Sequence, residues 1–349
     1  MKIIKIILIT LAIILCLLGL FLLISTLNDY RPDAQTSLYR TNDPDIIPDS
    51  AELSLITWNI GYCGLDSSMD FFYDGGEQVR PEKKIVVESL NGITEQLKQF
   101  SGYDFMLLQE VDISSKRSYH INEYDSISTA FPDWFTSFGM NYRVWCVPVP
   151  LKSPMGSVRS GLQTLSKHRP SSVTRFSFPG NYNWPVSLYM LDRCFMVNRY
   201  PVEGGKELVL INTHNSAYDN GSLRKEQMAY LKKFLLEEYE KGNFVIAGGD
   251  WNQSPADFEP GFNPELFDRK DLTYIEAGFP DPSWKWAYDA SVPTNRRVTE
   301  PYNPVLSPLT VIDQFLLSPN IKFIEVKGIE NGFRYSDHQP VILRVRVSD

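Results

Sequence analysis

The apolar residues of this chain fall into one long unbroken run near the N-terminus and a series of short runs farther along. The long run covers residues 6–24, in which Thr10 is the only polar residue. As a helix it would extend roughly 28 Å, close to the thickness of the hydrocarbon layer of a membrane. We therefore predict a transmembrane helix over residues 6–25.

The charges beside this helix indicate its orientation. Lys2 and Lys5 precede it, whereas the residues that follow carry no net positive charge. By the positive-inside rule, residues 1–5 would lie in the cytoplasm and the rest of the chain outside. A cleaved signal peptide is the alternative, but the apolar run is longer than the h-region of such peptides and no Ala-x-Ala site follows it. A lipoprotein signal at Cys16 is disfavoured, because the large Leu15 precedes it.

The segment after the helix has a different composition. Residues 26–51 contain Pro32, Pro44 and Pro48 among Asp, Asn, Ser and Thr, a mixture typical of an extended linker. We predict a stalk over residues 26–51 and one catalytic domain over residues 52–349.

Within this domain, short apolar runs alternate with amphipathic stretches. The short runs predict buried strands, because they are rich in β-branched residues and too short for helices. They span residues 53–60, 104–110, 206–214, 244–250, 309–317 and 341–347. Apolar residues three and four positions apart predict helices over residues 80–100 and 223–241. The alternation predicts an α/β or α+β fold with layered sheets.

Polar side chains stand where several predicted strands end. They are Asn59, Glu110, His214, Asp250 with Asn252, and Asp337 with His338. Any one of them could be a turn or surface residue, but five such places in one chain are hard to explain in that way. Strand ends hold side chains in rigid positions beside loops, so the pattern indicates a binding or catalytic site.

Composition narrows the chemistry. The net charge is −8 without a long basic run, which argues against general coating of nucleic acid. The four cysteines include no CxxC pair, which excludes a cysteine zinc cluster, and at most one disulfide could form among Cys63, Cys146 and Cys194. No HExxH, Gly-x-Ser-x-Gly or P-loop motif is present. Carboxylates and amides are hard ligands that suit Mg²⁺, with Mn²⁺ or Ca²⁺ as alternatives.

Six short motifs carry a resemblance to a known family. They are Thr57-Trp58-Asn59-Ile60, Leu108-Gln109-Glu110-Val111, Thr213-His214-Asn215-Ser216-Ala217, Gly249-Asp250-Trp251-Asn252, Ile312-Asp313-Gln314 and Ser336-Asp337-His338-Gln339-Pro340. Their order resembles the endonuclease/exonuclease/phosphatase superfamily, which includes deoxyribonuclease I, abasic-site endonucleases, neutral sphingomyelinases and inositol polyphosphate 5-phosphatases. The resemblance implies a four-layer α/β/β/α sandwich, with two central mixed sheets flanked by helices.

The resemblance also implies a metal site and a group of catalytic residues. Glu110 would be the main metal ligand, with Asn59 and Asp337 beside it in the metal shell. The catalytic residues would be His214, Asp250, Asn252, Asp313 and His338.

Each of these catalytic residues has an implied role. Asp250 would position or activate the attacking water, and Asn252 would hold a phosphate oxygen. His338, oriented by the Asp313 carboxylate, would act at the phosphate as a base or as a stabiliser of the transition state. His214 would act on the leaving side, which favours a phosphodiester substrate.

Two features of the sequence leave the substrate open. No acid between residues 147 and 161 could partner His214. Residues 61–80 and 131–185 form long predicted loops, rich in aromatic residues, that could pack on the domain or line the site. Three functions remain: an anchored extracytoplasmic phosphodiesterase acting on a lipid headgroup or another phosphodiester, a nuclease of the same superfamily, and a non-catalytic binding module.

Overall fold

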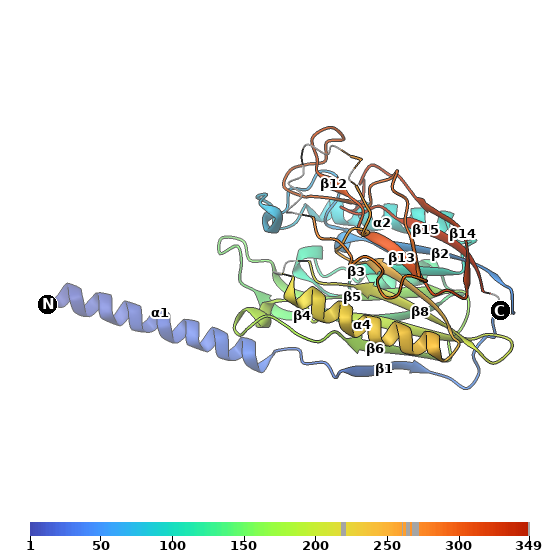
Figure 1. The fold of residues 1–349 in the computed structure, drawn as a ribbon. Helices are drawn as coiled ribbons and strands as arrows, with labels where there is room; N and C mark the ends of the chain where they lie inside the picture. The colour runs from blue at the N-terminus through green and yellow to red at the C-terminus, as the bar shows by residue number, and fades with distance from the viewer. Residues whose placement is uncertain (218–220, 260, 263–265, 267–271, 348–349) are drawn as a thin grey trace.

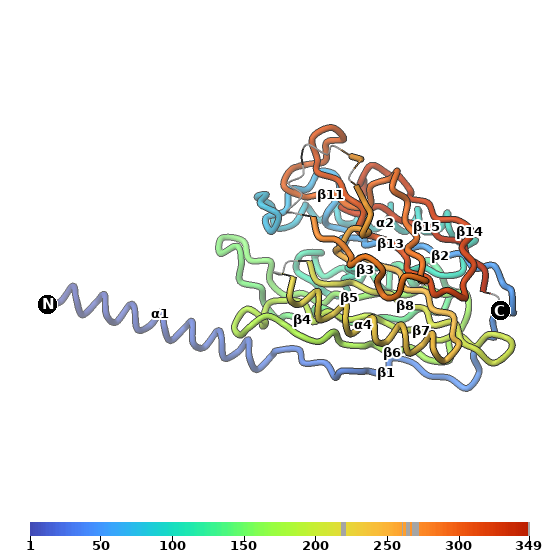
Figure 2. Tube along the Cα trace, in the orientation of Figure 1, coloured from blue at the N-terminus to red at the C-terminus, as the bar shows by residue number. Residues whose placement is uncertain are grey.

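The computed structural model describes residues 1–217, 221–259, 261–262, 266 and 272–347. Helix α1 (Lys2–Leu27) comes first and, apart from its last turns, extends away from the domain (Figures 1 and 2). In the described residues it is the one helix long and apolar enough to cross a membrane. It includes the predicted span over residues 6–25.

Two large sheets form the centre of the domain. Within the described residues the first sheet has seven strands, which in spatial order are β1 (Gln35–Arg40), β6 (Ser172–Ser177), β7 (Cys194–Pro201), β8 (Glu207–His214), β9 (Phe244–Asp250), β13 (Asp313–Leu317) and β10 (Lys285–Ala287). The second, in the same described part, has six strands in the spatial order β14 (Ile321–Gly328), β15 (Val341–Val347), β2 (Glu52–Asn59), β3 (Phe105–Asp112), β5 (Gly156–Ser166) and β4 (Phe135–Val147). A small ribbon pairs β11 (Asn295–Arg296) with β12 (Leu309–Thr310).

Helices cover the outer faces of both sheets (Figure 1). Helices α2 (Lys83–Gln99) and α3 (Glu123–Ala130) pack on the six-stranded sheet, and α4 (Ser222–Glu240) packs on the seven-stranded sheet. Short 3₁₀ turns occur in the connections: η1 (Gly61–Cys63), η2 (Phe72–Asp74), η3 (Lys116–Ser118) and η4 (Val186–Tyr189). The predicted four-layer α/β/β/α architecture is therefore confirmed.

Alternation along the strands explains the layering. In β2, Leu53 and Leu55 face the core between the sheets, whereas Ile56 and Trp58 face α2. Successive side chains of a strand point to opposite faces, so a strand buried on both faces is apolar at nearly every position. The same rule explains why β2, β3, β8, β9 and β15 could be predicted from sequence.

The predicted stalk is wrong for much of its length. Residues Gln35–Arg40 form β1, which pairs antiparallel with β6, and Ile47 is fully buried in the core between the sheets. Strand β1 lies at the sheet edge and is mostly exposed, so its sequence lacks the apolar alternation that marks a strand. The folded domain therefore begins before residue 52.

Two further segments differ from the predictions. The run 309–317 is not one strand: β12 and β13 join different sheets, because the backbone N–H groups of Ile312 and Asp313 turn to the hydroxyl of Thr294. The predicted long loop over residues 131–185 contains β4, β5 and β6. Polar residues such as Asn141 and Gln163 are buried along β4 and β5, and they obscured the strand pattern. All four cysteines are free, so no disulfide forms among them.

Candidate active site

Strand pairing brings three of the predicted residues together at one edge of the seven-stranded sheet. Strands β8 and β9 run parallel and place His214 opposite Asp250. Strands β9 and β13 run antiparallel and place Asp250 opposite Asp313. The three side chains come from distant parts of the sequence, yet all are fully buried or nearly so. The register of β8, β9 and β13 therefore brings His214, Asp250 and Asp313 together, and these residues form one half of the site.

Strand β9 needs a glycine just before Asp250, because its backbone lies very close to that of β8. Gly249 has φ +150°, and a Cβ at this position would collide with the carbonyl oxygen of Thr213 on β8. A side chain at residue 249 would push apart the two strands that carry His214 and Asp250. Gly249 is thus a packing requirement of the site.

The second sheet supplies the other half. The Ser336 hydroxyl donates to the carbonyl of Asn59 at 2.8 Å, and the indole N–H of Trp58 donates to the carbonyl of His338 at 3.0 Å. These bonds tie the segment before β15 to the end of β2. Asp337 and His338 therefore face the seven-stranded sheet across the end of the inter-sheet core.

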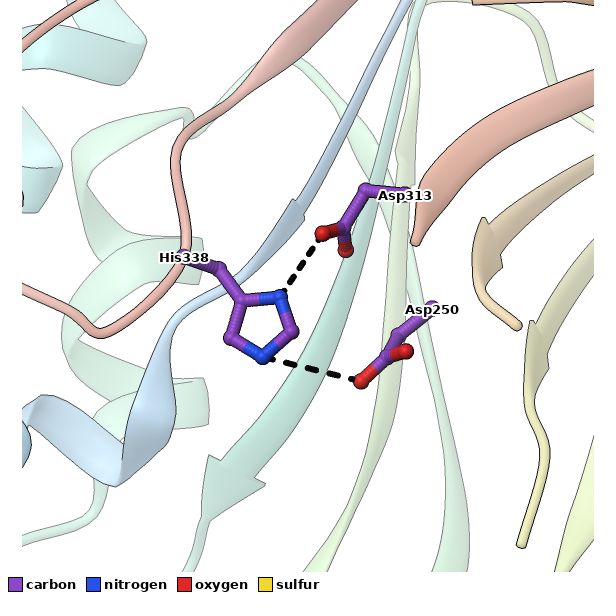
Figure 3. A group of neighbouring side chains, drawn as sticks. All are labelled: Asp250, Asp313 and His338. Carbon is purple, nitrogen blue, oxygen red and sulfur yellow. Dashed lines mark hydrogen bonds and ion pairs between the residues drawn. The ribbon is translucent and has the colours of Figure 1, made fainter. Parts of the chain in front are cut away.

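His338 lies at the centre of a group of buried side chains with Asp313 and Asp250 (Figure 3). Its Nδ1 lies 2.7 Å from Oδ2 of Asp313, and its Nε2 lies 3.8 Å from Oδ2 of Asp250. Burial alone would lower the pKa of His338, but the carboxylates of Asp313, Asp250 and Asp337 outweigh burial and raise this pKa well above its usual value. The predicted orientation of His338 by Asp313 matches this geometry.

His214 approaches Asp250 from the other side. Its Nε2 lies 3.4 Å from Oδ2 of Asp250 and 3.9 Å from Oε1 of Glu110. Burial, with smaller effects from Arg193, His338 and Arg117, lowers the pKa of His214 well below its usual value. Its Nδ1 is buried without a hydrogen-bond partner in the described structure. The carboxylates of Asp250 and Glu110 thus lie on the Nε2 side of the ring, and none of the described carboxylates forms a hydrogen bond with Nδ1.

The three residues predicted to bind metal lie at the end of the six-stranded sheet. Glu110 has φ +54°, a left-handed conformation uncommon for a residue with a side chain, beside a bulge in β3. Asn59 places its amide nitrogen 3.3 Å from Glu110 and 2.9 Å from Asp250, while its oxygen accepts from the Gly61 N–H. In this orientation the amide links the two carboxylates, and it would have to rotate to offer its oxygen to a metal.

The charges of this group fit a divalent cation. Burial, opposed by His338 and reinforced by Glu110, raises the pKa of Asp337 to about 7. Burial also raises the pKa of Asp250 to about 6. Carboxylates gathered with an amide form the oxygen-rich donor set that Mg²⁺ prefers, and a cation would offset their mutual repulsion.

Among the described residues, the group of three acidic or histidine side chains with donor atoms close enough for a cation is a different one. Ligand atoms of Asp250, Asp313 and His338 all lie within 4.8 Å of one another. However, Nδ1 of His338 already bonds to Asp313, so this histidine could offer only Nε2. This arrangement suits proton transfer and orientation, and Glu110 and Asp337 are the other carboxylates beside it that a metal could use.

Asn252 follows Asp250 in a strained turn. Its φ is +50°, its N–H donates to Oδ1 of Asp250 at 2.8 Å, and its amide donates to the carbonyl of Asn215 at 2.8 Å. Asn252 also lines the cavity beside Asp250 and His338. Its anchored amide is thus held where it could contact a substrate oxygen.

Asn295 is a site residue that the sequence did not reveal. Its amide nitrogen lies 3.0 Å from Nε2 of His338, and the preceding Thr294 accepts hydrogen bonds from the N–H groups of Ile312 and Asp313. The segment 294–296 therefore supports both members of the His338–Asp313 pair. No apolar run or recognised motif marks this segment.

A cavity of about 570 Å³ opens onto these residues. Tyr73 and Asp74 from the 61–80 segment line it, whereas Cys63 and Met69 of that segment are buried in the domain. This loop therefore packs on the domain and also forms one wall. His120 and His168 are not among the described residues that line the cavity.

Arginines form part of the same cavity. Arg117, Arg193 and Arg224 line it, and Arg117 is held by Asp112 at 3.0 Å with its guanidinium 3.6 Å from the ring centre of Tyr62. Guanidinium groups bind anionic esters, and carboxylates bind metal ions. A cavity that combines both with imidazoles therefore suits an anionic ester and a metal bound side by side.

Comparisons with known proteins agree with this geometry. The Endonuclease/Exonuclease/phosphatase family profile matches residues 56–338. The chain resembles an endonuclease/exonuclease/phosphatase from Beutenbergia cavernae, with TM-score 0.55, 17% identity, and 85% of this chain and 72% of that chain covered. It also resembles ANGEL2, described as a 2′,3′-cyclic phosphatase, with TM-score 0.54, 14% identity, and coverage of 91% and 99%. A third match is truncated TDP2 from Caenorhabditis elegans, with TM-score 0.51, 15% identity, and coverage of 85% and 98%. None of the curated proteins compared matches the chain.

Proposed function

Since the chain belongs to the endonuclease/exonuclease/phosphatase family, whose members hydrolyse phosphoesters, we propose that it is a membrane-anchored, Mg²⁺-dependent phosphodiesterase with an extracytoplasmic catalytic domain. One observation carries the proposal: Oδ2 of Asp250 lies between the Nε2 atoms of His214 and His338, at 3.4 and 3.8 Å. A phosphoryl group in the adjoining cavity would have a potential proton acceptor and two imidazoles around it.

The residues divide the reaction between them. Asp250 accepts a proton from water as the water oxygen bonds to phosphorus. The bond from phosphorus to the leaving oxygen breaks, and the proton taken up by Asp250 passes to this oxygen. His214, which its lowered pKa keeps neutral, lies beside Asp250 and donates a hydrogen bond from Nε2 to the leaving oxygen. No net acid or base is consumed.

The negative charge that develops on the phosphoryl oxygens needs donors. Asn252, fixed by its bond to Asn215, and His338, fixed by Asp313, are positioned to supply them. Glu110 and Asp337, with Asn59 after rotation of its amide, would hold Mg²⁺, and Mn²⁺ or Ca²⁺ are alternatives. The bound ion would supply Lewis-acid polarisation of the phosphoryl group.

A diester is favoured over a monoester by the placement of His214. Stabilisation of a leaving alkoxide matters most when that alkoxide is a poor leaving group, and His214 is a second imidazole that can donate a hydrogen bond to it. ANGEL2, which has a similar fold, was solved in complex with adenosine-2′,3′-vanadate. In that ligand two ribose oxygens are joined to one vanadate, as two ester oxygens are joined to one phosphorus atom in a phosphodiester.

The anchor is supported by α1. Its apolar side chains are exposed along most of the helix, and water exposure of such a surface is unfavourable. Lys2 and Lys5 before the apolar run favour a cytoplasmic N-terminus. A signal peptide removed after export is the alternative; both would place the domain outside the cytoplasm.

A nuclease of the same family is the second candidate, because Arg117, Arg193 and Arg224 line the cavity and guanidinium groups bind phosphates. Full-length protein in phosphatidylcholine vesicles with Mg²⁺ would be assayed on bis(p-nitrophenyl) phosphate, p-nitrophenyl phosphate and plasmid DNA. The proposal expects faster cleavage of the diester than of the monoester, without plasmid nicking. Nicking would favour the nuclease, and no hydrolysis of any ester would favour a binding module.

A further inference from the structure

The end of α1 lies at the same edge of the domain as the active site. Strand β7 begins beside His214, because Phe195 pairs with Thr213. Strand β5 begins beyond the end of β3, because Ser160 pairs with Asp112. The loop before β7 and the loop between β4 and β5 therefore both belong to the active-site edge.

These two loops hold the last turns of α1. The indole N–H of Trp145, at the end of β4, donates to the Ser25 hydroxyl at 3.0 Å, and the Tyr189 hydroxyl lies 3.1 Å from the same oxygen. The indole N–H of Trp184 donates to the Thr26 hydroxyl at 3.2 Å. Ser25 and Thr26 end the apolar run of α1, so the contacts lie where a membrane-spanning helix would leave the lipid.

Apolar side chains beside these contacts are exposed. We name as the apolar patch the residues Trp145, Val149, Leu151, Trp184 and Val186, whose exposed fractions range from 38% to 86%. The loop between β4 and β5, which carries two of them, extends toward the side of α1 in Figure 1. An exposed group of large apolar side chains on a folded domain indicates an interaction surface.

We propose that the apolar patch rests in the headgroup region of the same bilayer that α1 spans, so that the domain has a second membrane contact and its active site takes phosphodiesters carried by lipids. This inference rests on the proposed function. Two exposed tryptophans are suited to a membrane surface, because an indole combines an apolar body with an N–H donor. Lys152, next to Leu151, adds a charge that anionic lipids attract.

The patch also connects directly to the catalytic cavity. Trp184 and Tyr189 contact α1, whereas Tyr182, Met190 and Leu191 of the same segment line the cavity. The segment 182–191 would thus contact the membrane on one side and form part of the cavity wall on the other. A lipid headgroup could reach the cavity with its acyl chains still in the bilayer.

The first test measures depth without using activity. Leu151→Cys, in full-length protein with Cys16 and Cys146 changed to Ser, would carry a polarity-sensitive fluorophore in phosphatidylcholine–phosphatidylglycerol vesicles. Ile46→Cys is the matched control, because Ile46 is 62% exposed and its neighbour Ile47 bridges Val202, just past the far end of β7. A blue-shifted emission at Leu151 alone is expected. Equal, water-like emission at both positions would overturn the inference.

The second test uses two substrates. Leu151→Asp combined with Trp184→Ser should reduce hydrolysis of lipid phosphodiesters in the vesicles about tenfold, equivalent to about 1.4 kcal/mol, and leave hydrolysis of bis(p-nitrophenyl) phosphate unchanged. Ile46→Asp should change neither rate. If the variant cleaves lipid as fast as the wild type, the apolar patch is not needed for lipid access. If the wild type cleaves neither substrate, the proposed function fails, and the depth measurement still decides whether the patch meets the bilayer.

Discussion

Oδ2 of Asp313 lies 2.7 Å from Nδ1 of His338, and both side chains are buried where the ends of the two sheets meet. This pair leaves Nε2 of His338 directed toward Asp250 and the cavity (Figure 3). The hydrogen bond selects which nitrogen of the imidazole faces the substrate. Loss of the Asp313 charge should therefore impair catalysis more than folding.

Asp313→Asn should lower kcat/KM for bis(p-nitrophenyl) phosphate by about 10³- to 10⁴-fold, the loss seen when an acid that orients a catalytic histidine becomes an amide. The volume of the side chain is kept, so the thermal unfolding temperature should change little. Asp281→Asn is the control, since Asp281 is exposed. Near-normal turnover by Asp313→Asn would remove this carboxylate from the mechanism.

His214→Ala should slow the hydrolysis of diesters by an amount that depends on their leaving group. With an alkyl leaving group, the loss of the hydrogen bond that aids its departure should cost about 10²- to 10⁴-fold in kcat. With p-nitrophenolate, a stable anion, the loss should be much smaller. The measurement is kcat at one pH for a diester with an alkyl leaving group and for bis(p-nitrophenyl) phosphate. His168→Ala is the control, because His168 lies outside the cavity. Equal losses for both leaving groups would argue against a role on the leaving side.

Metal removal should silence the enzyme. EDTA should abolish hydrolysis and Mg²⁺ should restore it. Mg²⁺ should also raise the thermal unfolding temperature of the wild type, because a ligand that binds the folded state stabilises it. Glu110→Gln should lose both responses, whereas the exposed Glu77→Gln should keep them. Activity that persists after chelation would exclude a metal from catalysis.

Glu238 should make stability depend on pH. Burial would raise its pKa, but hydrogen bonds from Arg199, Lys241 and Asn243 outweigh burial and lower the pKa to about 2. A depressed pKa contributes stability above the unfolded value of about 4.5 and loses it as the pH falls through about 2.

Glu238→Gln tests this directly. The variant should unfold at lower denaturant concentration than the wild type at pH 7, and the difference should shrink toward pH 2. Glu237→Gln is the matched control on the same helix, because Glu237 is 53% exposed and pairs with Lys233 at 3.8 Å. A difference that does not depend on pH would show that the effect comes from packing.

Several parts of the molecule follow from the sequence alone. The buried strands β2, β3, β8 and β9 are evident as short apolar runs, because both of their faces are covered. Asn59, Glu110, His214 and Asp250 stand where those runs end, so the sequence was enough to predict them as candidate site residues, and the structure brings them close together. The apolar run of α1 is equally clear, since it depends on composition and length alone.

Other parts depend on contacts between distant segments. The pairing of His214, Asp250 and Asp313 depends on strand register, and Asn295 reaches His338 from a segment without any pattern. Strand β1 is an exposed edge strand. Its sequence resembles that of a linker, because its pairing with β6 leaves little trace in its own residues.

The contact of α1 with Trp145 and Trp184 also came only from the tertiary structure. Local sequence records how each segment is buried, through its own spacing of apolar residues. Which segments meet is decided by the packing of the whole chain, where hydrogen bonds and apolar contacts join residues more than a hundred positions apart. The sequence thus determined the layers and most of the candidate catalytic side chains, and the tertiary structure decided how they meet and that the edge with the candidate site carries α1.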